Sequence, residues 1–139
     1  MKFLLDTNIL SEVRKGPRAH GGVLAWFAAN HDAYFAIPAI ALFELQMGAE
    51  KVRQQDPLRA AEFDFWVGKL AGGTNVLSLD SAAAREAARL LNKQSMVLLA
   101  DAMIAAIARV NGLTVATRNT RDFELFFVPL VDPFLFPKA

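Results

Sequence analysis

Three carboxylates interrupt apolar segments of this 139-residue chain and limit what it can fold into. Asp6 ends an apolar N-terminal run, Glu44 lies inside the apolar stretch 37–45, and Asp101 divides the apolar stretch 96–107. A desolvated carboxylate costs several kcal/mol unless a cation, a metal ion or several hydrogen-bond donors compensate it. Apart from one lysine near Asp6, no Lys or Arg lies within five residues of these acids. A divalent metal ion held between the three is the simplest shared compensation.

Two of the three acids also have a structural explanation. Asp is a favoured helix N-cap, and a helix is expected directly after Asp6. Asp101 begins an expected helix, where the macrodipole contributes about 0.3–1 kcal/mol, too little to offset full burial. Glu44 has no such alternative, because its neighbours at helical spacing place it on the apolar side of its helix. Those neighbours are Ile40, Ala41, Met47 and Gly48.

The available ligand types favour Mg²⁺ or Mn²⁺ over zinc. The chain has no cysteine, and its two histidines, His20 and His31, fall in expected turns or loops, so neither is assigned a role. Mg²⁺ takes oxygen ligands and is commonly held by one or two carboxylates together with the phosphates of a substrate. An oxygen-only cluster is therefore typical of phosphoryl chemistry, in which a metal activates water and stabilises the leaving oxygen.

Expected strands and helices alternate along the chain. The expected strands are 2–6, 33–37, 75–79, 113–117 and a short one around 127–131, and the expected helices are 8–15, 23–30, 38–53, 58–70, 81–93 and 100–110. This alternation predicts an α/β fold with a parallel sheet covered on both faces. Ligands bind at the carboxyl ends of the strands in such sheets, where Asp6 and the segment 117–119 fall. Without repeats or linkers, residues 1–139 are expected to form one domain.

Local signals set several of these boundaries. Asp56-Pro57 is an N-cap followed by a first helical residue, and Asp80-Ser81 is a second cap. Gly72-Gly73 is expected to end the helix that Pro57 begins, and Asn111-Gly112 to close another in the left-handed conformation. Pro38 suits the first turn of the helix that carries Glu44.

The composition excludes several classes of protein. The longest stretch without Asp, Glu, Lys or Arg, 19–31, is too short to span a bilayer, and Asp6 arrives before a signal-peptide core can form. A net charge of +1 means that any nucleic-acid surface must be a local patch. With 54% hydrophobic residues and a mean hydropathy of +0.27, the chain is expected to carry a helical dimer or partner surface.

A second polar cluster spans residues 117–123. Asp122 is a candidate fourth oxygen ligand or water-positioning group, and Arg118 and Arg121 are candidates for phosphate contacts. The alternative is a polar loop with a helix cap. Two basic clusters have the spacing of solvated helix faces, with nucleic-acid contact as the alternative; they are Arg14, Lys15, Arg18 and Arg85, Arg89, Lys93. Five aromatic side chains are interpreted as core or dimer contacts, not base-stacking platforms: Trp26, Phe27, Phe63, Phe65 and Trp66.

Four segments together resemble the PIN-domain family, and within it the VapC/FitB-type toxins of bacterial type II toxin–antitoxin modules. The segments are 5–12, 43–48, 101–106 and 116–123. Each is unspecific alone, but their order and spacing within a chain of this length are characteristic. Relatives often carry Ser or Thr three residues before the helical Glu, where this chain has Ala41.

The resemblance implies a three-layer α/β/α fold and a cytoplasmic Mg²⁺- or Mn²⁺-dependent endoribonuclease acting on structured RNA. It implies that Asp6, Glu44, Asp101 and Asp122 are the catalytic and metal-binding acids, with Asp122 in the family's more variable fourth site. The neighbouring polar residues are expected to bind substrate; they are Thr7, Asn8, Thr117, Arg118 and Asn119. The implied partners are an RNA substrate, a second copy of the chain and a small antitoxin that threads into the active-site groove, as a homodimer or a dimer of heterodimers.

Two other interpretations stay open. A haloacid-dehalogenase-like phosphatase needs a second Asp two residues after the first, and this chain has Asn8 there. A non-enzymatic module would use the acids to bind a partner's arginines, although none of the expected acids is missing.

Overall fold

The computed structural model describes residues 2–73 and 75–137 and contains a five-stranded sheet in the order β3-β2-β1-β4-β5. The strands are β1 (Lys2–Leu5), β2 (Tyr34–Pro38), β3 (Asn75–Leu77), β4 (Thr114–Ala116) and β5 (Leu130–Val131). All four pairings between neighbouring strands are parallel. The predicted parallel α/β architecture is therefore confirmed. The chain builds the sheet outward from β1 in both directions, so the topological switch point lies between β1 and β4.

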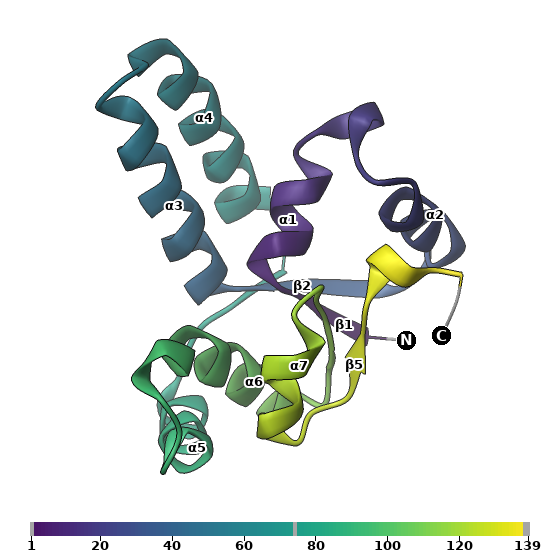
Figure 1. Ribbon diagram of the computed structural model, residues 1–139, viewed down its shortest axis with the longest axis vertical. Helices are drawn as coiled ribbons and strands as arrows, with labels where there is room; N and C mark the ends of the chain where they lie inside the picture. Colours follow the sequence, from purple (N-terminus) through teal and green to yellow (C-terminus); the bar gives the residue numbers. More distant parts are fainter. Residues whose placement is uncertain (1, 74, 138–139) are drawn as a thin grey trace.

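Helices cover both faces of this sheet, as Figure 1 shows. On one face lie α1 (Thr7–Val13), α2 (Gly21–Ala29), α3 (Ala39–Arg53) and α4 (Pro57–Gly73). On the other lie α5 (Ser81–Leu91), α6 (Leu99–Asn111) and the short α7 (Thr120–Phe123). Alternation along β1 supplies both cores, because Phe3 and Leu5 pack toward the first group of helices and Leu4 packs toward the second. The helices α3 and α4 form a hairpin that extends away from the sheet (Figure 1).

Several predicted helix ends are confirmed by the local hydrogen bonds. Asp80 caps α5 by accepting from the backbone N–H of Ala83 at 2.9 Å. Asp56 accepts from the backbone N–H of Arg59 at 3.2 Å at the start of α4. Gly112 ends α6 with φ of 65°, a left-handed conformation that costs glycine little.

Other predicted boundaries are wrong. Pro38 is the last residue of β2 and the N-cap of α3, so it precedes the first turn of the helix. The helix α4 includes Gly72-Gly73 and is not ended by them. The helix α5 ends at Leu91, before Lys93, whose φ of 67° is incompatible with a right-handed helix.

The C-terminal segment differs most from its prediction. The expected strand 127–131 is reduced to Leu130–Val131, because Phe127 adopts a left-handed conformation with φ of 53° that cannot continue an extended strand. The helix α7 was not predicted. Four short 3₁₀ helices were not predicted either: Gly16–Arg18, Met96–Leu98, Glu124–Phe126 and Pro133–Leu135.

Most of the helical aromatic residues belong to the core. Trp26 is buried and contacts Phe3 and Phe27 edge-on. Phe63 and Trp66 are half-buried against the same core cluster, whereas the Phe65 side chain is 68% exposed. Exposed apolar side chains on the α3–α4 hairpin are instead Phe43, Met47, Leu58 and Phe65. Across the described ranges, no helix combines the length and the apolar character needed to cross a membrane.

Candidate active site

Asp6 lies at the carboxyl end of the central strand, beside the switch point between β1 and β4. It is the N-cap of α1, and its Oδ1 accepts from the backbone N–H of Thr7 at 2.8 Å. Its Oδ2 accepts from the Thr117 hydroxyl at 2.7 Å and from the Asn8 amide at 3.1 Å. Burial raises the pKa of Asp6, the hydrogen bonds oppose that rise, and the charge of Glu44 adds to it. The capping role and a role in a polar site therefore coexist.

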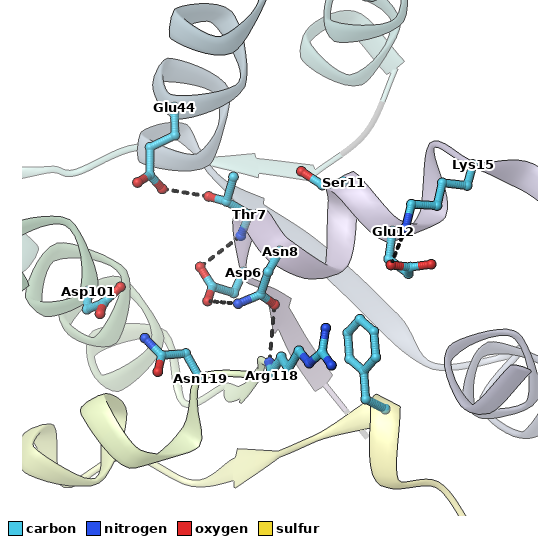
Figure 2. A pocket seen from close by; sticks show the side chains of 11 residues that line it. Asp6, Thr7, Asn8, Ser11, Glu12, Lys15, Glu44, Asp101, Arg118 and Asn119 are labelled. Atoms are coloured by element: carbon cyan, nitrogen blue, oxygen red, sulfur yellow. Dashed lines mark hydrogen bonds and ion pairs between the residues drawn. The ribbon is translucent and has the colours of Figure 1, made fainter. Parts of the chain in front are cut away.

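Glu44 reaches the same region from α3, the helix that follows β2, and β2 is the strand that pairs with β1. The Thr7 hydroxyl donates to Glu44 Oε1 at 2.6 Å, which links α1 to α3 next to Asp6 (Figure 2). Ala41, one turn earlier on α3, is fully buried in the core and provides no hydroxyl. The hydroxyl that orients Glu44 thus comes from Thr7.

Asp101 is in the first turn of α6, and its carboxylate points toward the space between Asp6 and Glu44 (Figure 2). No side chain or backbone group within 2–73 and 75–137 donates a hydrogen bond to this carboxylate. Burial raises the pKa of Asp101 to about 7, with further contributions from the negative charges of Asp6, Asp122 and Glu44. In the part of the chain that the structure describes, this carboxylate therefore has neither a hydrogen-bond donor nor a basic side chain to compensate its charge.

One cavity of about 440 Å³ joins these acids. Asp6, Glu44 and Asp101 all line it, so the structure brings the three acids to one cavity. Figure 2 shows Lys15 and Arg118 on the side of the cavity away from Glu44 and Asp101. The site therefore combines an acidic part with a basic margin.

Thr117 connects the ends of β1 and β4 beside Asp6. It follows β4 and is fully buried, and its hydroxyl donates to Asp6 and accepts from the Asn119 backbone N–H at 2.9 Å. Asn8 bridges the same two strand ends, because its Oδ1 accepts from the Arg118 backbone N–H at 3.1 Å. The predicted meeting of Asp6 with the segment 117–119 at one sheet edge is confirmed.

Asp122 is connected to the site through Asn119 and through its charge. It is in α7, does not line the cavity, and its Oδ2 accepts from the Asn119 side-chain amide at 2.9 Å. Its charge nevertheless contributes to the raised pKa of Asp101. Asp122 thus affects the site electrostatically and through Asn119.

The donor set fits a hard divalent cation in chemistry. Within the described residues, no three His, Cys, Asp or Glu side chains form a ready-made set of metal ligands. The cavity does bring together carboxylates that repel one another, and burial together with this repulsion raises the pKa of Asp101. An oxygen cluster with uncompensated negative charge is the environment that Mg²⁺ and Mn²⁺ bind with few protein ligands and several waters.

Comparison with known proteins identifies the family. The sequence pattern of the PIN domain matches residues 3–126. The chain belongs to the PIN-domain family. It is 37% identical over 139 residues to the plasmid stability protein StbB of Pseudomonas syringae pv. tomato, covering 94% of this chain and 97% of that protein. It is 36% identical over 128 residues to the tRNA(fMet)-specific endonuclease VapC of Shigella flexneri, covering 89% of this chain and 91% of that protein.

Solved structures of PIN-domain toxins share the fold. FitAcB from Neisseria gonorrhoeae superposes with a TM-score of 0.70 at 28% identity, covering 95% of this chain and 98% of that one. DNA-bound VapBC from Salmonella typhimurium gives a TM-score of 0.71 at 28% identity, covering 96% and 98%. The expected α/β/α fold and the resemblance to this family are therefore both confirmed.

Four cavity residues of this PIN domain were not predicted as site residues: Ser11, Glu12, Lys15 and Phe134. The first three follow Asn8 at helical spacing, so projecting α1 from Asn8 would have found them. Glu12 accepts from Lys15 at 3.0 Å, and this contact holds the pKa of Glu12 below its usual value. No sequence signal marks Phe134, which reaches the cavity from the C-terminal 3₁₀ helix and lies 4.4 Å from the Arg118 guanidinium.

Proposed function

We propose that this PIN-domain protein is a Mg²⁺- or Mn²⁺-dependent endoribonuclease, the toxin of a type II toxin–antitoxin system that acts in the cytoplasm as a single-domain subunit. The observation that carries the proposal is the cavity lined by Asp6, Glu44 and Asp101, where burial, together with the negative charges of Asp6, Asp122 and Glu44, raises the pKa of Asp101 to about 7. The names of its relatives support the choice of RNA, because a VapC relative at 36% identity is a tRNA(fMet)-specific endonuclease.

Asp6, Glu44 and Asp101 would hold the metal, with Asp122 contributing to the fourth position. When bound, such an ion supplies an activated water for attack on a phosphodiester and stabilises the negative charge of the leaving oxygen. The three acids belong to different elements, namely the end of β1, α3 and α6. Their relative placement therefore depends on the packing of both helical layers against the sheet.

The polar residues next to the acids have two proposed roles, orienting the carboxylates and contacting the RNA. Thr7 donates a hydrogen bond to Glu44, and Asn8 and Thr117 donate to Asp6. Their proposed contribution to substrate binding is therefore indirect: they fix the orientation of these two carboxylates. Arg118 carries a guanidinium at the cavity, where it can meet a phosphate of the RNA. Asn119 lines the cavity and also holds Asp122.

The proposed partners are an antitoxin and a second copy of the chain. The similar structures from Neisseria gonorrhoeae and Salmonella typhimurium are the complexes FitAcB and VapBC. An antitoxin that occupies the cavity with a basic side chain would neutralise the acids and exclude both metal and RNA. The exposed apolar residues of the α3–α4 hairpin, Phe43 and Met47 among them, provide a helical surface for a two-fold homodimer or a dimer of heterodimers.

Cleavage assays on three substrates test the proposed activity. The purified protein, free of antitoxin, is incubated with tRNA(fMet), total bacterial RNA and p-nitrophenyl phosphate, each with Mg²⁺, with Mn²⁺ and with EDTA. We expect internal RNA cleavage in both metals, none in EDTA, and no release of p-nitrophenol. Hydrolysis of the phosphomonoester without RNA cleavage would favour a phosphatase. Inactivity on all substrates, with no heat of metal binding in calorimetry, would favour a binding module.

A further inference from the structure

A second cavity, of about 540 Å³, opens between the C-terminal end of α1 and the first half of α4. Four of its lining residues are basic and one is acidic; they are Arg14, Lys15, Arg18, Arg59 and Glu62. Trp66 provides an aromatic wall. Below, these six residues are called the α1–α4 pocket. On a chain with a net charge of only +1, this is a local concentration of positive charge.

The arginines of the α1–α4 pocket form no ion pairs with acidic side chains of the described residues. Within 2–73 and 75–137, none of Arg14, Arg18 and Arg59 belongs to an ion pair, whereas five other pairs occur in the same ranges. Arg14 is held by aromatic contacts, with its guanidinium 4.0 Å from the centre of the Phe63 ring and 5.8 Å from that of Trp66. The pocket thus keeps several guanidinium groups available to an anion.

The α1–α4 pocket adjoins the acidic cavity. Ser11 of α1 and Lys15, just beyond the end of that helix, line both, so the two cavities lie side by side. A chain whose reacting phosphate lies at Asp6, Glu44 and Asp101 would pass over Lys15 and reach Arg18 and Arg59. A polyanion with regularly repeated phosphates can place one phosphate in the acidic cavity and others in the α1–α4 pocket at the same time.

We infer that the α1–α4 pocket binds phosphates of the RNA on one side of the bond that is cleaved, with Arg18 and Arg59 as direct phosphate contacts. The inference deepens the proposed ribonuclease function and rests on it. Trp66 provides the surface against which a ribose or base of the same segment packs. A protein partner would need acidic side chains at several points of this pocket, whereas every nucleotide of RNA brings its own charge.

The salt dependence of RNA binding tests this inference. The background is Asp101→Asn in EDTA, so that the RNA stays intact and Mg²⁺ does not compete for phosphates. Fluorescein-labelled tRNA(fMet) is titrated by anisotropy at several NaCl concentrations, without and with Arg18→Ala/Arg59→Ala. Loss of two phosphate contacts should lower the slope of log K against log[salt] by about 1.4–1.8, and weaken binding on the order of 20-fold at ~0.1 M salt.

Two further variants separate charge from damage to the fold. Arg85→Ala/Arg89→Ala removes the same charge from exposed positions of α5, away from both cavities, and should keep the wild-type slope. Arg18→Lys/Arg59→Lys keeps both charges and should restore most of the slope. Thermal melting of each variant checks that it is folded. In the otherwise wild-type enzyme, Arg18→Ala/Arg59→Ala should lower kcat/KM for tRNA cleavage by a factor similar to the loss of affinity.

The outcomes distinguish failure of this inference from failure of the proposed function. If the wild-type protein cleaves tRNA and Arg18→Ala/Arg59→Ala binds it with unchanged affinity and slope, the inference is overturned and the ribonuclease function stands. If that variant keeps RNA binding but no longer co-purifies with an antitoxin encoded beside its gene, the pocket belongs to a protein partner, which also overturns the inference. A wild-type protein that cleaves no RNA overturns the proposed function and this inference with it.

Discussion

Replacing Asp101 by Asn should stabilise the metal-free protein and abolish its nuclease activity. The amide keeps the shape of the carboxylate but removes a charge that no donor in the described structure compensates and that Asp6, Asp122 and Glu44 repel. In the folded protein the pKa rises from 3.8 to about 7, which corresponds to an upper limit of ~4 kcal/mol at neutral pH. Asp101 is half-buried, so solvent screening reduces the expected gain to ~1–2 kcal/mol.

The sign of the pH dependence follows from the raised pKa of Asp101. Between about pH 4 and pH 7, the folded protein retains a proton that the unfolded chain has lost, so the cost of this carboxylate grows as pH rises through that window. Asp101→Asn should therefore match the wild-type protein near pH 4 and exceed its melting temperature by roughly 3–6 °C at pH 8. Differential scanning calorimetry in EDTA measures both values.

Two controls make this prediction specific. Asp32→Asn, at an exposed position outside the cavity, should change the free energy of unfolding by less than ~0.5 kcal/mol at either pH. Millimolar Mg²⁺ should stabilise the wild-type protein more than Asp101→Asn, because a ligand that binds only the folded state adds its binding free energy. An Asp101→Asn protein that melts below the wild-type protein at pH 8 in EDTA would refute the reasoning about uncompensated charge.

Three other substitutions test the contacts around the acids and the C-terminal packing. Thr7→Val removes the hydroxyl that orients Glu44 and should lower RNA cleavage by about 10–100-fold, whereas Thr7→Ser should retain most activity in the same assay. Thr117→Val takes a donor from the buried carboxylate beside it and should destabilise the protein by ~1–3 kcal/mol in urea titrations, with Thr117→Ser close to wild type. Gly22→Ala places a Cβ 3.0 Å from two backbone oxygens of the C-terminal segment and should cost ~1–3 kcal/mol. Gly68→Ala, where no atom lies within 4 Å of the added Cβ, should stabilise α4 by up to ~1 kcal/mol, and the opposite order of these two glycine variants would contradict the packing argument.

The placement of the three acids around one cavity was predictable because it depends on periodicity and topology. Alternating strands and helices indicated a parallel sheet, and Asp6 and Thr117 follow strands whose carboxyl ends meet at the switch point. Glu44 was recognised because helical spacing placed it among apolar neighbours. These signals are repeated along the sequence, so they survive errors of several residues in each boundary.

The polar contacts that organise the cavity were not predictable. The bond from Thr7 to Glu44 joins residues 37 positions apart, and the one from Thr117 to Asp6 joins residues 111 apart. Sequence spacing carries no information about such pairs. The position of Phe134 in the cavity was not predictable either, because it lies on a 3₁₀ helix that the apolar C-terminal sequence does not indicate.

The separation of Asp122 from the cavity also depended on an unpredicted element. The helix α7 begins at Thr120, and within it Asp122 forms a local hydrogen bond with Asn119 instead of lining the cavity. A four-residue helix is too short to produce a recognisable periodicity in the sequence. The sequence therefore predicted the edge of the sheet at which Asp122 lies, but not its position relative to the other acids.

The metal dependence of RNA cleavage tests the central claim most directly. The initial rate of tRNA(fMet) cleavage is measured for the wild-type protein and for Asp101→Asn as Mn²⁺ is titrated into an EDTA-treated preparation. We expect no cleavage before metal is added, a saturable rise in rate for the wild-type protein, and no rise for Asp101→Asn. A wild-type rate that is the same in EDTA and in Mn²⁺, or equal rates for the two proteins, would contradict it.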